Sequence, residues 1–298
     1  MQGDTISFMP WYVLAGIAAV LAATVAVIEK KLLVRQHAMQ FSASLAILTL
    51  VTASPFVFTA DFSSLTFTPV LAMFLLSMLG ATAFLLVSKA MRHMEISSAS
   101  PLLALQPGIT ALFAWITIGE TLSIGDVTGI CLLVLGAYVL ETRHHGSVWE
   151  PIRMLVESKY IHYILFAIVL YGLTALGDRI VLFHYSISVP TYMVVVHVFL
   201  AFHFLWMMTV FHGGVKEIRV TLKDVGWVLF VVAILTVGHR FVFAHAVAQE
   251  RVGLAEAIKR SSAFFVTLIG GELFHEKNLK RKLVACLIIL AGVALIVV

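Results

Sequence analysis

The sequence predicts an all-α, polytopic membrane protein whose ten transmembrane helices form two inverted five-helix repeats. Three observations carry this prediction: an apolar composition, a series of long apolar runs, and a one-sided distribution of cations. Of the 298 residues, 61% are hydrophobic and 12% are charged, whereas a soluble domain has about 25% charged and about 45–50% apolar residues. The polar segments between the apolar runs are too short to hold a sizeable soluble domain.

A helix that crosses a bilayer needs about 20 predominantly apolar residues. The chain has ten such runs: 10–29, 38–58, 69–90, 97–118, 124–141, 160–183, 189–211, 225–246, 253–274 and 279–298. The longest connection, residues 143–159, holds Trp149 and Pro151 among other apolar residues and predicts a short interfacial helix in the cytoplasm. It divides the chain into a first repeat, 1–142, and a second repeat, 160–298.

Cations between the runs lie almost entirely in the odd-numbered connections. These carry Lys30, Lys31 and Arg35; Lys89 and Arg92; Arg143, Arg153 and Lys159; Lys216, Arg219 and Lys223; and Lys277, Lys280, Arg281 and Lys282. The even-numbered connections and both termini carry only Arg251. Because cytoplasmic loops are enriched in Lys and Arg, we expect both termini outside. With five spans per half, the second half then enters the membrane in the opposite sense, as in inverted-repeat transporters.

The two halves also share a weak sequence repeat. A shift of 149 residues places Glu29-Lys30 on Asp178-Arg179, and each pair lies near the end of the first span of its half. A shift of 156 residues superimposes identical residues at five places: Ala90 on Ala246, Ala99 on Ala255, Leu112 on Leu268, Glu120 on Glu276 and Gly136 on Gly292. Together with the matching helix order and the opposed charge bias, these identities indicate a duplication.

Several blocks in the two halves resemble one transporter family. The first half reads Ser100-Pro101, Gln106-Pro107, Ile118-Gly119-Glu120, Gly129 and Gly136, and the second reads Ile258-Lys259-Arg260, Phe274-His275-Glu276-Lys277 and Gly292. This pattern resembles the EamA-type branch of the drug/metabolite transporter superfamily over nearly the whole chain, with His275 where that family usually has glycine. The resemblance implies two antiparallel repeats around a central cavity and transport by alternating access. Many members have both termini in the cytoplasm, the reverse of the charge count.

A second likeness concerns the ninth span alone. Lys259-Arg260 resembles the Lys-Arg pair with which plastid sugar-phosphate translocators of the same superfamily hold phosphate, and this likeness implies an anionic group on the solute. The pair begins seven residues into the predicted span, where a charge costs about 2.5–3.5 kcal/mol on insertion scales. Glu256 lies at helical spacing from both cations. The pair therefore either faces the solute or is neutralised by Glu256, and the two alternatives can coexist.

Asp178, Arg179 and Arg240 are further charged residues deep in apolar runs. Because adjacent residues on a helix do not face each other, Asp178 and Arg179 should serve different partners. Arg240 could pair with Asp178 or Glu256 across helices. Counting Glu272 as well, the deep groups carry one surplus positive charge, which favours an anionic or zwitterionic solute such as an amino acid or an organic phosphate. The alternative is a structural ion network.

Other residues have more limited predicted roles. Gln106 should line the cavity in a fourth span kinked by Pro101 and Pro107, and His239 is the candidate for proton coupling. Glu29 and Lys30 are predicted to be interfacial anchors. Two further sets are predicted to be structural: Glu120 and Glu276 close helices, and Gly136 and Gly292 allow close helix packing.

The resulting hypothesis is a secondary transporter that moves a small polar metabolite across the cell membrane. Its predicted solute-binding residues are Lys259, Arg260, Glu256, Arg179, Asp178, Arg240 and Gln106. The chain has no Walker motif, dinucleotide fingerprint, nucleophile elbow or zinc motif, so we predict no enzyme activity, no cofactor, no metal and no nucleic-acid partner. Expected partners are the solute and the lipid bilayer, and a homodimer stays open. Rival hypotheses are a lipid-linked flippase of the same superfamily and a non-transporting scaffold.

Overall fold

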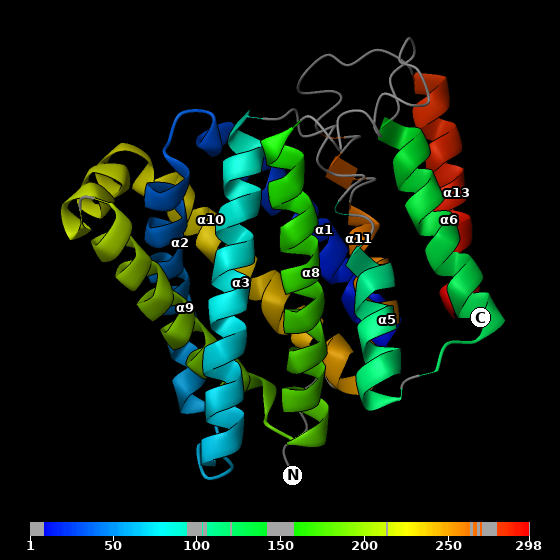
Figure 1. Cartoon of the computed structure of the whole chain (residues 1–298), viewed down its shortest axis with the longest axis horizontal. Coiled ribbons are helices and arrows are strands. Elements are labelled where there is room, and N and C mark those ends of the chain that lie inside the picture. Colours follow the sequence, from blue (N-terminus) through cyan, green and yellow to red (C-terminus); the bar gives the residue numbers. More distant parts are fainter. Residues whose placement is uncertain are drawn as a thin grey trace.

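A computed structural model of the chain describes residues 9–93, 103, 106–119, 121–141, 158–212, 214–262, 265–266, 269 and 279–297. Every regular element in these ranges is a helix (Figure 1), which confirms the all-α class. The helices are α1 (Trp11–Leu33), α2 (Ala38–Ala53) followed by the 3-10 turn η2 (Ser54–Phe58), α3 (Phe67–His93), α5 (Gln106–Ile118), α6 (Ile124–Glu141), α8 (Lys159–Arg179) followed by the π-helical turn η3 (Ile180–His184), α9 (Val189–Phe211), α10 (Val215–Gln249), α11 (Val252–Arg260) and α13 (Leu279–Val297).

Six helical segments are long and apolar enough to cross a membrane: Trp11–Leu33, Ala38–Phe58, Phe67–His93, Lys159–His184, Val189–Phe211 and Lys216–Gln249. Gln106–Ile118 and Ile124–Gly136 are shorter apolar helices. The chain is therefore a multi-pass membrane protein, whereas the count of ten spans stays a prediction. The predicted cytoplasmic connection lies mostly outside the described residues, as do Pro101, Glu120 and Glu276.

Two helices extend well beyond the apolar runs that predicted them. α1 continues to Leu33, so that Glu29 and Lys30 lie inside the helix. α10 begins at Val215, ten residues before the predicted span, and the cation-bearing connection expected there is helical. An apolar run marks the part of a helix that can contact lipid. The backbone hydrogen bonds that define the helix continue through polar residues as well.

The helices of the two halves pack in an interchangeable pattern. α1 packs against α10 and α11, while α8 packs against α3 and α5; α2 packs against α9 and α10, while α9 packs against α2 and α3. α5 also packs against α11, and α6 packs against α13. These principal contacts are unchanged when α1 is exchanged with α8, α2 with α9, α3 with α10, α5 with α11, and α6 with α13. Two inverted repeats would produce this pattern.

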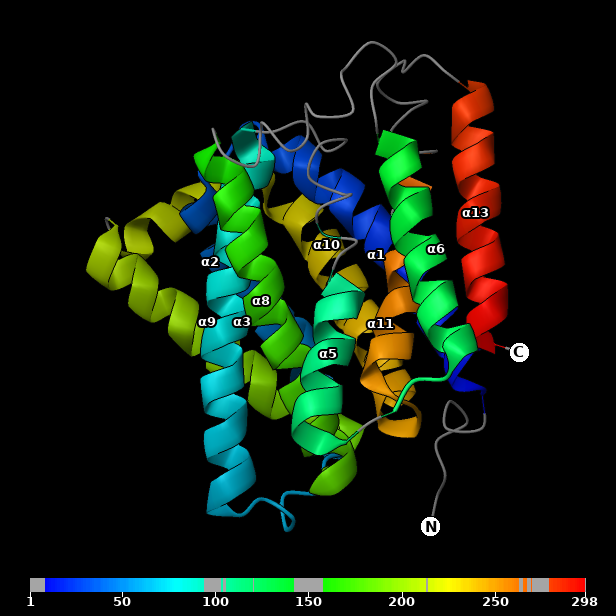
Figure 2. The same ribbon diagram turned by 45° about the vertical axis from the view of Figure 1, so that its right-hand side comes forward.

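α6 and α13 form a pair at one edge of the bundle, with α2 and α9 at the opposite edge (Figures 1 and 2). Two glycines let α6 and α13 approach closely. A Cβ atom on Gly136 would lie 2.6 Å from Cγ1 of Ile289, and one on Gly292 would lie 2.8 Å from the carbonyl oxygen of Gly129. These are the glycines that the 156-residue shift superimposes, and small residues at such crossings are typical of membrane helices.

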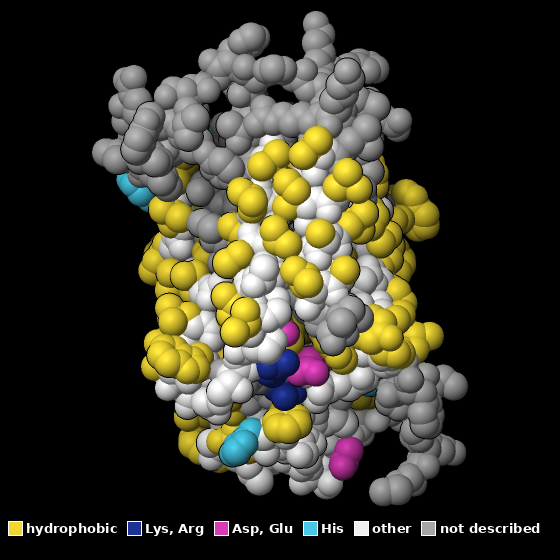
Figure 3. Space-filling model, turned by 90° about the vertical axis from the view of Figure 1, so that its right-hand side faces the viewer, with side chains coloured by type: hydrophobic (Ala, Val, Ile, Leu, Met, Phe, Trp, Pro, Cys, Tyr) yellow, Lys and Arg dark blue, Asp and Glu magenta, His cyan; other side chains and the backbone are white. Residues whose placement is uncertain are grey.

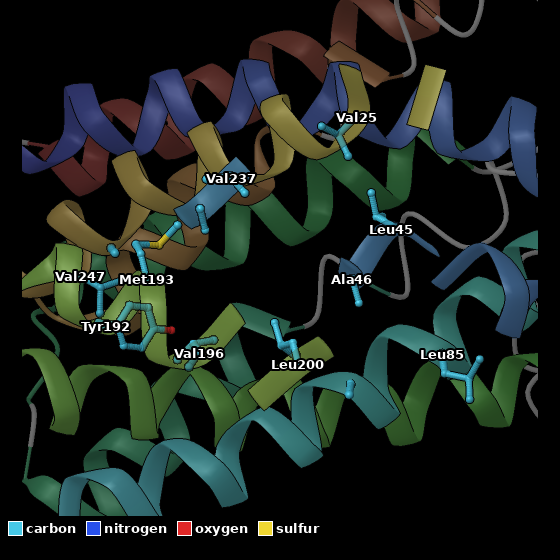
Figure 4. Packing of buried hydrophobic residues seen from close by; sticks show 14 of the residues in the cluster. Val25, Leu45, Ala46, Leu85, Tyr192, Met193, Val196, Leu200, Val237 and Val247 are labelled. Carbon is cyan, nitrogen blue, oxygen red and sulfur yellow. The ribbon is translucent and has the colours of Figure 1, made fainter. Parts of the chain in front are cut away.

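Buried apolar side chains from α1, α2, α3, α9 and α10 meet in the centre of the bundle (Figure 4). Hydrophobic side chains are spread over the middle of the face drawn in Figure 3, whereas the charged side chains seen there lie in its lower part. Such an apolar surface is unfavourable in water and favourable in the hydrocarbon part of a bilayer. The central packing and the apolar exterior together leave few places where charge can lie.

The ends of three helices meet at one end of the bundle. Near the end of α1, Lys30 donates a hydrogen bond to the carbonyl oxygen of Met91, which is near the end of α3. The ring of His93 at the end of α3 stacks on Tyr160 at the start of α8, with 4.7 Å between the ring centroids. α1 and α3 therefore end where α8 begins, and the end of α8 lies at the opposite end of the bundle.

Candidate functional site

A cavity of about 300 Å³ lies between α1, α3, α5, α8, α9, α10 and α11. Both halves of the chain contribute to it. Much of its wall is apolar, and includes Val25, Leu76, Phe84, Val87, Leu182, Met193, Val196, Leu200 and Phe243. Several of these side chains appear in Figure 4 as part of the central packing. An apolar cavity with a few polar groups is the usual form of a small-molecule site.

Among the residues that the structure describes, three carboxylates and three cations line the same cavity: Glu29 on α1, Asp178 on α8, Arg240 on α10, and Glu256, Lys259 and Arg260 on α11. Five of the six are among the predicted solute-binding residues. Because isolated charges are costly in a membrane interior, their arrangement relative to one another decides which of them can receive a solute.

The charges on α11 are paired with one another. The Nζ of Lys259 lies 2.6 Å from Oε1 of Glu256, and the Nε of Arg260 lies 4.0 Å from Oε2 of the same carboxylate. Lys259 also lies over the ring of Phe243, 3.7 Å from its centroid, where the electron-rich face attracts a cation. The predicted pairing within α11 is confirmed. A role in solute binding stays a prediction for all three residues.

Asp178 and Arg179 contact different partners, as predicted. The hydroxyl group of Tyr192 is the polar neighbour that acts on Asp178. The Nη1 atom of Arg179 donates to the carbonyl oxygens of Val247, at 2.6 Å, and Ala248, at 3.2 Å. Neighbouring residues on an α-helix point about 100° apart, so that only Asp178 lines the cavity. The structure thus does not bring Arg179 together with the other predicted solute-binding residues.

Lys30 makes the same kind of contact in the first half of the chain. It donates to Met91, two residues before the end of α3, and Arg179 donates to Val247, two residues before the end of α10. Cations near the C-terminus of a helix satisfy its last carbonyl groups. Met91 and Val247 are 156 residues apart, the shift at which the helical blocks of the two halves superimpose.

Glu29 lies on the cavity wall, so its prediction as an interfacial anchor was wrong. Because α1 continues to Leu33, Glu29 is one turn inside the helix. The sequence held a signal for this position: the 149-residue shift superimposes Glu29 on Asp178. The two carboxylates occupy corresponding places, and each precedes a cation that bonds to the end of another helix.

Arg240 is within electrostatic reach of both Glu29 and Asp178. Within the described ranges, neither Arg240 nor Glu29 makes a hydrogen bond or a close ion pair. The predicted pairing of Arg240 with Asp178 or Glu256 is therefore not a direct contact in this structure. A guanidinium group and a carboxylate thus face one cavity with their hydrogen-bonding capacity unused among the described residues.

The remaining predicted residues also lie at this cavity or close to it. Gln106 and His239 line the cavity, and Oε1 of Gln106 and Nδ1 of His239 are buried without a hydrogen-bond partner among the described residues. Pro107 occupies the first turn of α5, where its missing N–H breaks no helical hydrogen bond.

Sequence reasoning missed several polar lining residues, among them Tyr171, Tyr192 and His197. The Nδ1 atom of His197 lies 2.6 Å from the carbonyl oxygen of Met193, while its Nε2 atom is buried without a partner in the described part of the chain. Single polar residues in apolar helices have no distinguishing spacing, so the sequence offered no signal for them. Within the described residues, no group of three or more His, Cys, Asp or Glu side chains could hold a metal ion.

Comparisons with known proteins address the family and the fold. Residues 9–142 match the family model described as "EamA-like transporter family". A solved crystal structure described as "Crystal structure of protein" is similar to the chain with a TM-score of 0.71 and 16% sequence identity, over 96% of this chain and 95% of that one. At this identity the likeness concerns the fold alone, and it extends over both halves. No curated protein matches the chain.

Proposed function

We propose that the chain, whose residues 9–142 match the model of the EamA-like transporter family of the drug/metabolite transporter superfamily, is a secondary transporter for a small zwitterionic metabolite. The proposed location is the cytoplasmic membrane. The cavity between the two halves is the solute site, and the halves rock against each other so that it opens to one side at a time. The amino acids are the simplest solutes of this class.

The charges of the cavity support a zwitterion over a simple anion. Lys259 and Glu256 neutralise each other at 2.6 Å. Arg240 and Glu29 are left without close partners among the described residues. A guanidinium group binds a carboxylate through two parallel hydrogen bonds, and a carboxylate binds an ammonium group. One cavity thus offers a partner for each end of an amino acid, and this is the observation that carries the proposal.

The charge balance of the cavity lining also supports a zwitterionic solute. The sequence tally included Arg179 and Glu272 and had one surplus positive charge. Arg179 points away from the cavity, Glu272 lies outside the described residues, and Glu29 joins the lining, so that among the described lining residues three cations face three carboxylates. A neutral lining has no net attraction for a solute with a single charge. The cavity volume of about 300 Å³ is at the lower limit of ligand sites, which suits a small solute.

Solute counterflow in proteoliposomes tests the proposal. Purified protein is reconstituted, vesicles are loaded with a mixture of unlabelled amino acids, and entry of a labelled amino acid is followed. Parallel assays use a dicarboxylate, an organic phosphate and a diamine. We expect exchange of the zwitterion and at least a tenfold loss in Arg240→Met, because a buried guanidinium–carboxylate contact contributes several kcal/mol. Arg219→Met, on the polar start of the same helix, is the matched control.

The alternatives predict different results. Exchange restricted to the phosphate or the dicarboxylate, with Arg240→Met unaffected, would reject the zwitterion. Scrambling of a fluorescent lipid without exchange of any solute would favour the flippase. Wild-type vesicles that do neither would reject transport by the reconstituted protein. Lys259→Met and Arg260→Met in the same assay show whether the α11 cations also contact the solute.

A further inference from the structure

The corresponding carboxylates of the two halves lie towards opposite ends of the cavity. Glu29 is four residues before the end of α1, and Asp178 is six residues before the end of the continuous helix formed by α8 and η3. These offsets amount to about 6 Å and about 9 Å along the helices. Because α1 ends where α8 begins, each carboxylate lies nearer to a different side of the membrane.

Among the described residues, Arg240 is the cation that acts electrostatically on both carboxylates, and Lys259 also acts on Asp178. Arg240 is seven residues before Val247, to which Arg179 bonds. Arg240 and the two carboxylates together carry one net negative charge. A guanidinium group can pair closely with one of these carboxylates at a time, so the other needs a further cation whenever water is excluded.

We propose that Glu29 and Asp178 are the proton-coupling residues of the transporter, and that a proton crosses together with the solute. This inference depends on the proposed function. When the carboxylate group of the solute binds Arg240, Glu29 loses its nearby cation, and Asp178 is left with Lys259, which Glu256 already holds at 2.6 Å. The ammonium group of the solute neutralises one of the two proposed carboxylates. A proton from the water on the open side binds the other, forming a carboxylic acid. After the halves have moved and the solute has left, the proton passes across the cavity to the carboxylate that held the ammonium group, which now faces the opposite side and releases the proton to water there.

The inverted arrangement gives each carboxylate access to one side. The carboxylate nearer the open end exchanges its proton with water, while the other is enclosed. Lys30 and Arg179 bond to the ends of α3 and α10 and thereby hold the helix turn that bears each carboxylate. Two equivalent groups at opposite ends are what an alternating-access cycle needs for proton uptake on one side and release on the other.

Other titratable and charged groups face the same cavity: Tyr171 on α8, Tyr192 and His197 on α9, His239 and Arg240 on α10, and Glu256, Lys259 and Arg260 on α11. Glu256 differs from the two proposed groups because it already holds Lys259 at 2.6 Å. His239, the sequence-based candidate, is adjacent to Arg240, and a second positive charge there is opposed by the guanidinium group. The carboxylates around Arg240 are therefore the better proton acceptors.

The test separates driven uptake from exchange in the same vesicles. An acidic outside and a neutral inside are imposed on proteoliposomes, and accumulation of a labelled amino acid and the signal of a trapped pH dye are recorded. Wild type should accumulate the solute above its outside concentration and acidify the interior. Glu29→Gln and Asp178→Asn should each lose accumulation and the dye signal at least tenfold relative to the counterflow rate of the same variant, because proton coupling is lost in addition to any loss of solute binding.

Glu217→Gln is the matched control, because Glu217 lies on α10 outside the cavity and bonds to Gln40. Full accumulation in Glu29→Gln or Asp178→Asn would overturn the inference. The same conclusion would follow if wild type exchanged solute without responding to the pH gradient, or if only His239→Asn lost the response. Absence of counterflow in wild type would reject the proposed function instead, so the two failures are distinguishable.

Discussion

At the scale of single residues, Glu256 determines how two cations are tolerated inside the bundle. Its side chain is 3% exposed, and it holds Lys259 directly and Arg260 at a longer distance. Removing one partner of a buried pair leaves an uncompensated charge, which costs more than replacing both partners. The pairing of Glu256 with Lys259 can therefore be tested by the stability of single and double variants, without a transport assay.

Glu256→Gln should destabilise the protein by on the order of 3 kcal/mol, because Lys259 keeps its charge without a carboxylate. The double variant Glu256→Gln/Lys259→Met should recover most of this loss. Thermal melting of the detergent-solubilised protein measures both, with Lys259→Met as the third corner of the cycle. Additive effects of the two substitutions would contradict the pairing.

The same residue scale shows what sequence spacing could and could not predict. The i,i+3 spacing of Glu256 and Lys259 predicted their contact, and the adjacency of Asp178 and Arg179 predicted their different partners. Glu29 was misplaced because the end of an apolar run was taken as the end of the helix. Tyr192 and His197 reach the cavity through the packing of α9, and nothing in their own sequence neighbourhood indicates this.

At the scale of helices, α6 and α13 depend on glycine where they cross. A Cβ atom on Gly292 would lie 2.8 Å from a backbone oxygen of α6 and 3.0 Å from the backbone nitrogen of Leu133. Backbone atoms cannot move aside as a flexible side chain can, so the two helices must separate. Few other helices pack against this pair, and its own contact has to hold it together.

Gly292→Ala should therefore lower the melting temperature, with a loss of about 1–3 kcal/mol from overpacking. Gly16→Ala is the matched control, since a Cβ atom on Gly16 in α1 has no neighbour within 4 Å. An equal melting temperature for the two variants would show that the close crossing of α6 and α13 does not contribute to stability.

At the scale of the whole molecule, the two halves are interleaved rather than adjacent. α1 packs mainly against α10, and α8 packs mainly against α3, so the first helix of each half finds its main partner in the other half. Arg251, between α10 and α11, also forms an ion pair with Asp126 of α6 at 3.1 Å. Neither half alone can bury these helices or enclose the cavity.

Residues 1–146 and 147–298, expressed separately, should each fail to give a monodisperse protein in detergent. Co-expression of the two pieces should give a complex that co-purifies and keeps counterflow. The interleaved contacts are the reason, because each piece supplies the missing packing surface of the other. A monodisperse first piece that melts cooperatively on its own would contradict this account.

The sequence by itself determined the chemical class of the protein. Apolar runs, cations confined to alternate connections and two weakly repeated blocks suffice for a helical membrane protein with matching halves, because lipid imposes these patterns on the chain. The tertiary structure alone decided which charges share a cavity. It placed Glu29 on the same cavity wall as Arg240 and directed Arg179 to the end of α10. Those outcomes depend on helix rotation and on contacts between residues far apart in the chain, and one-dimensional spacing does not record them.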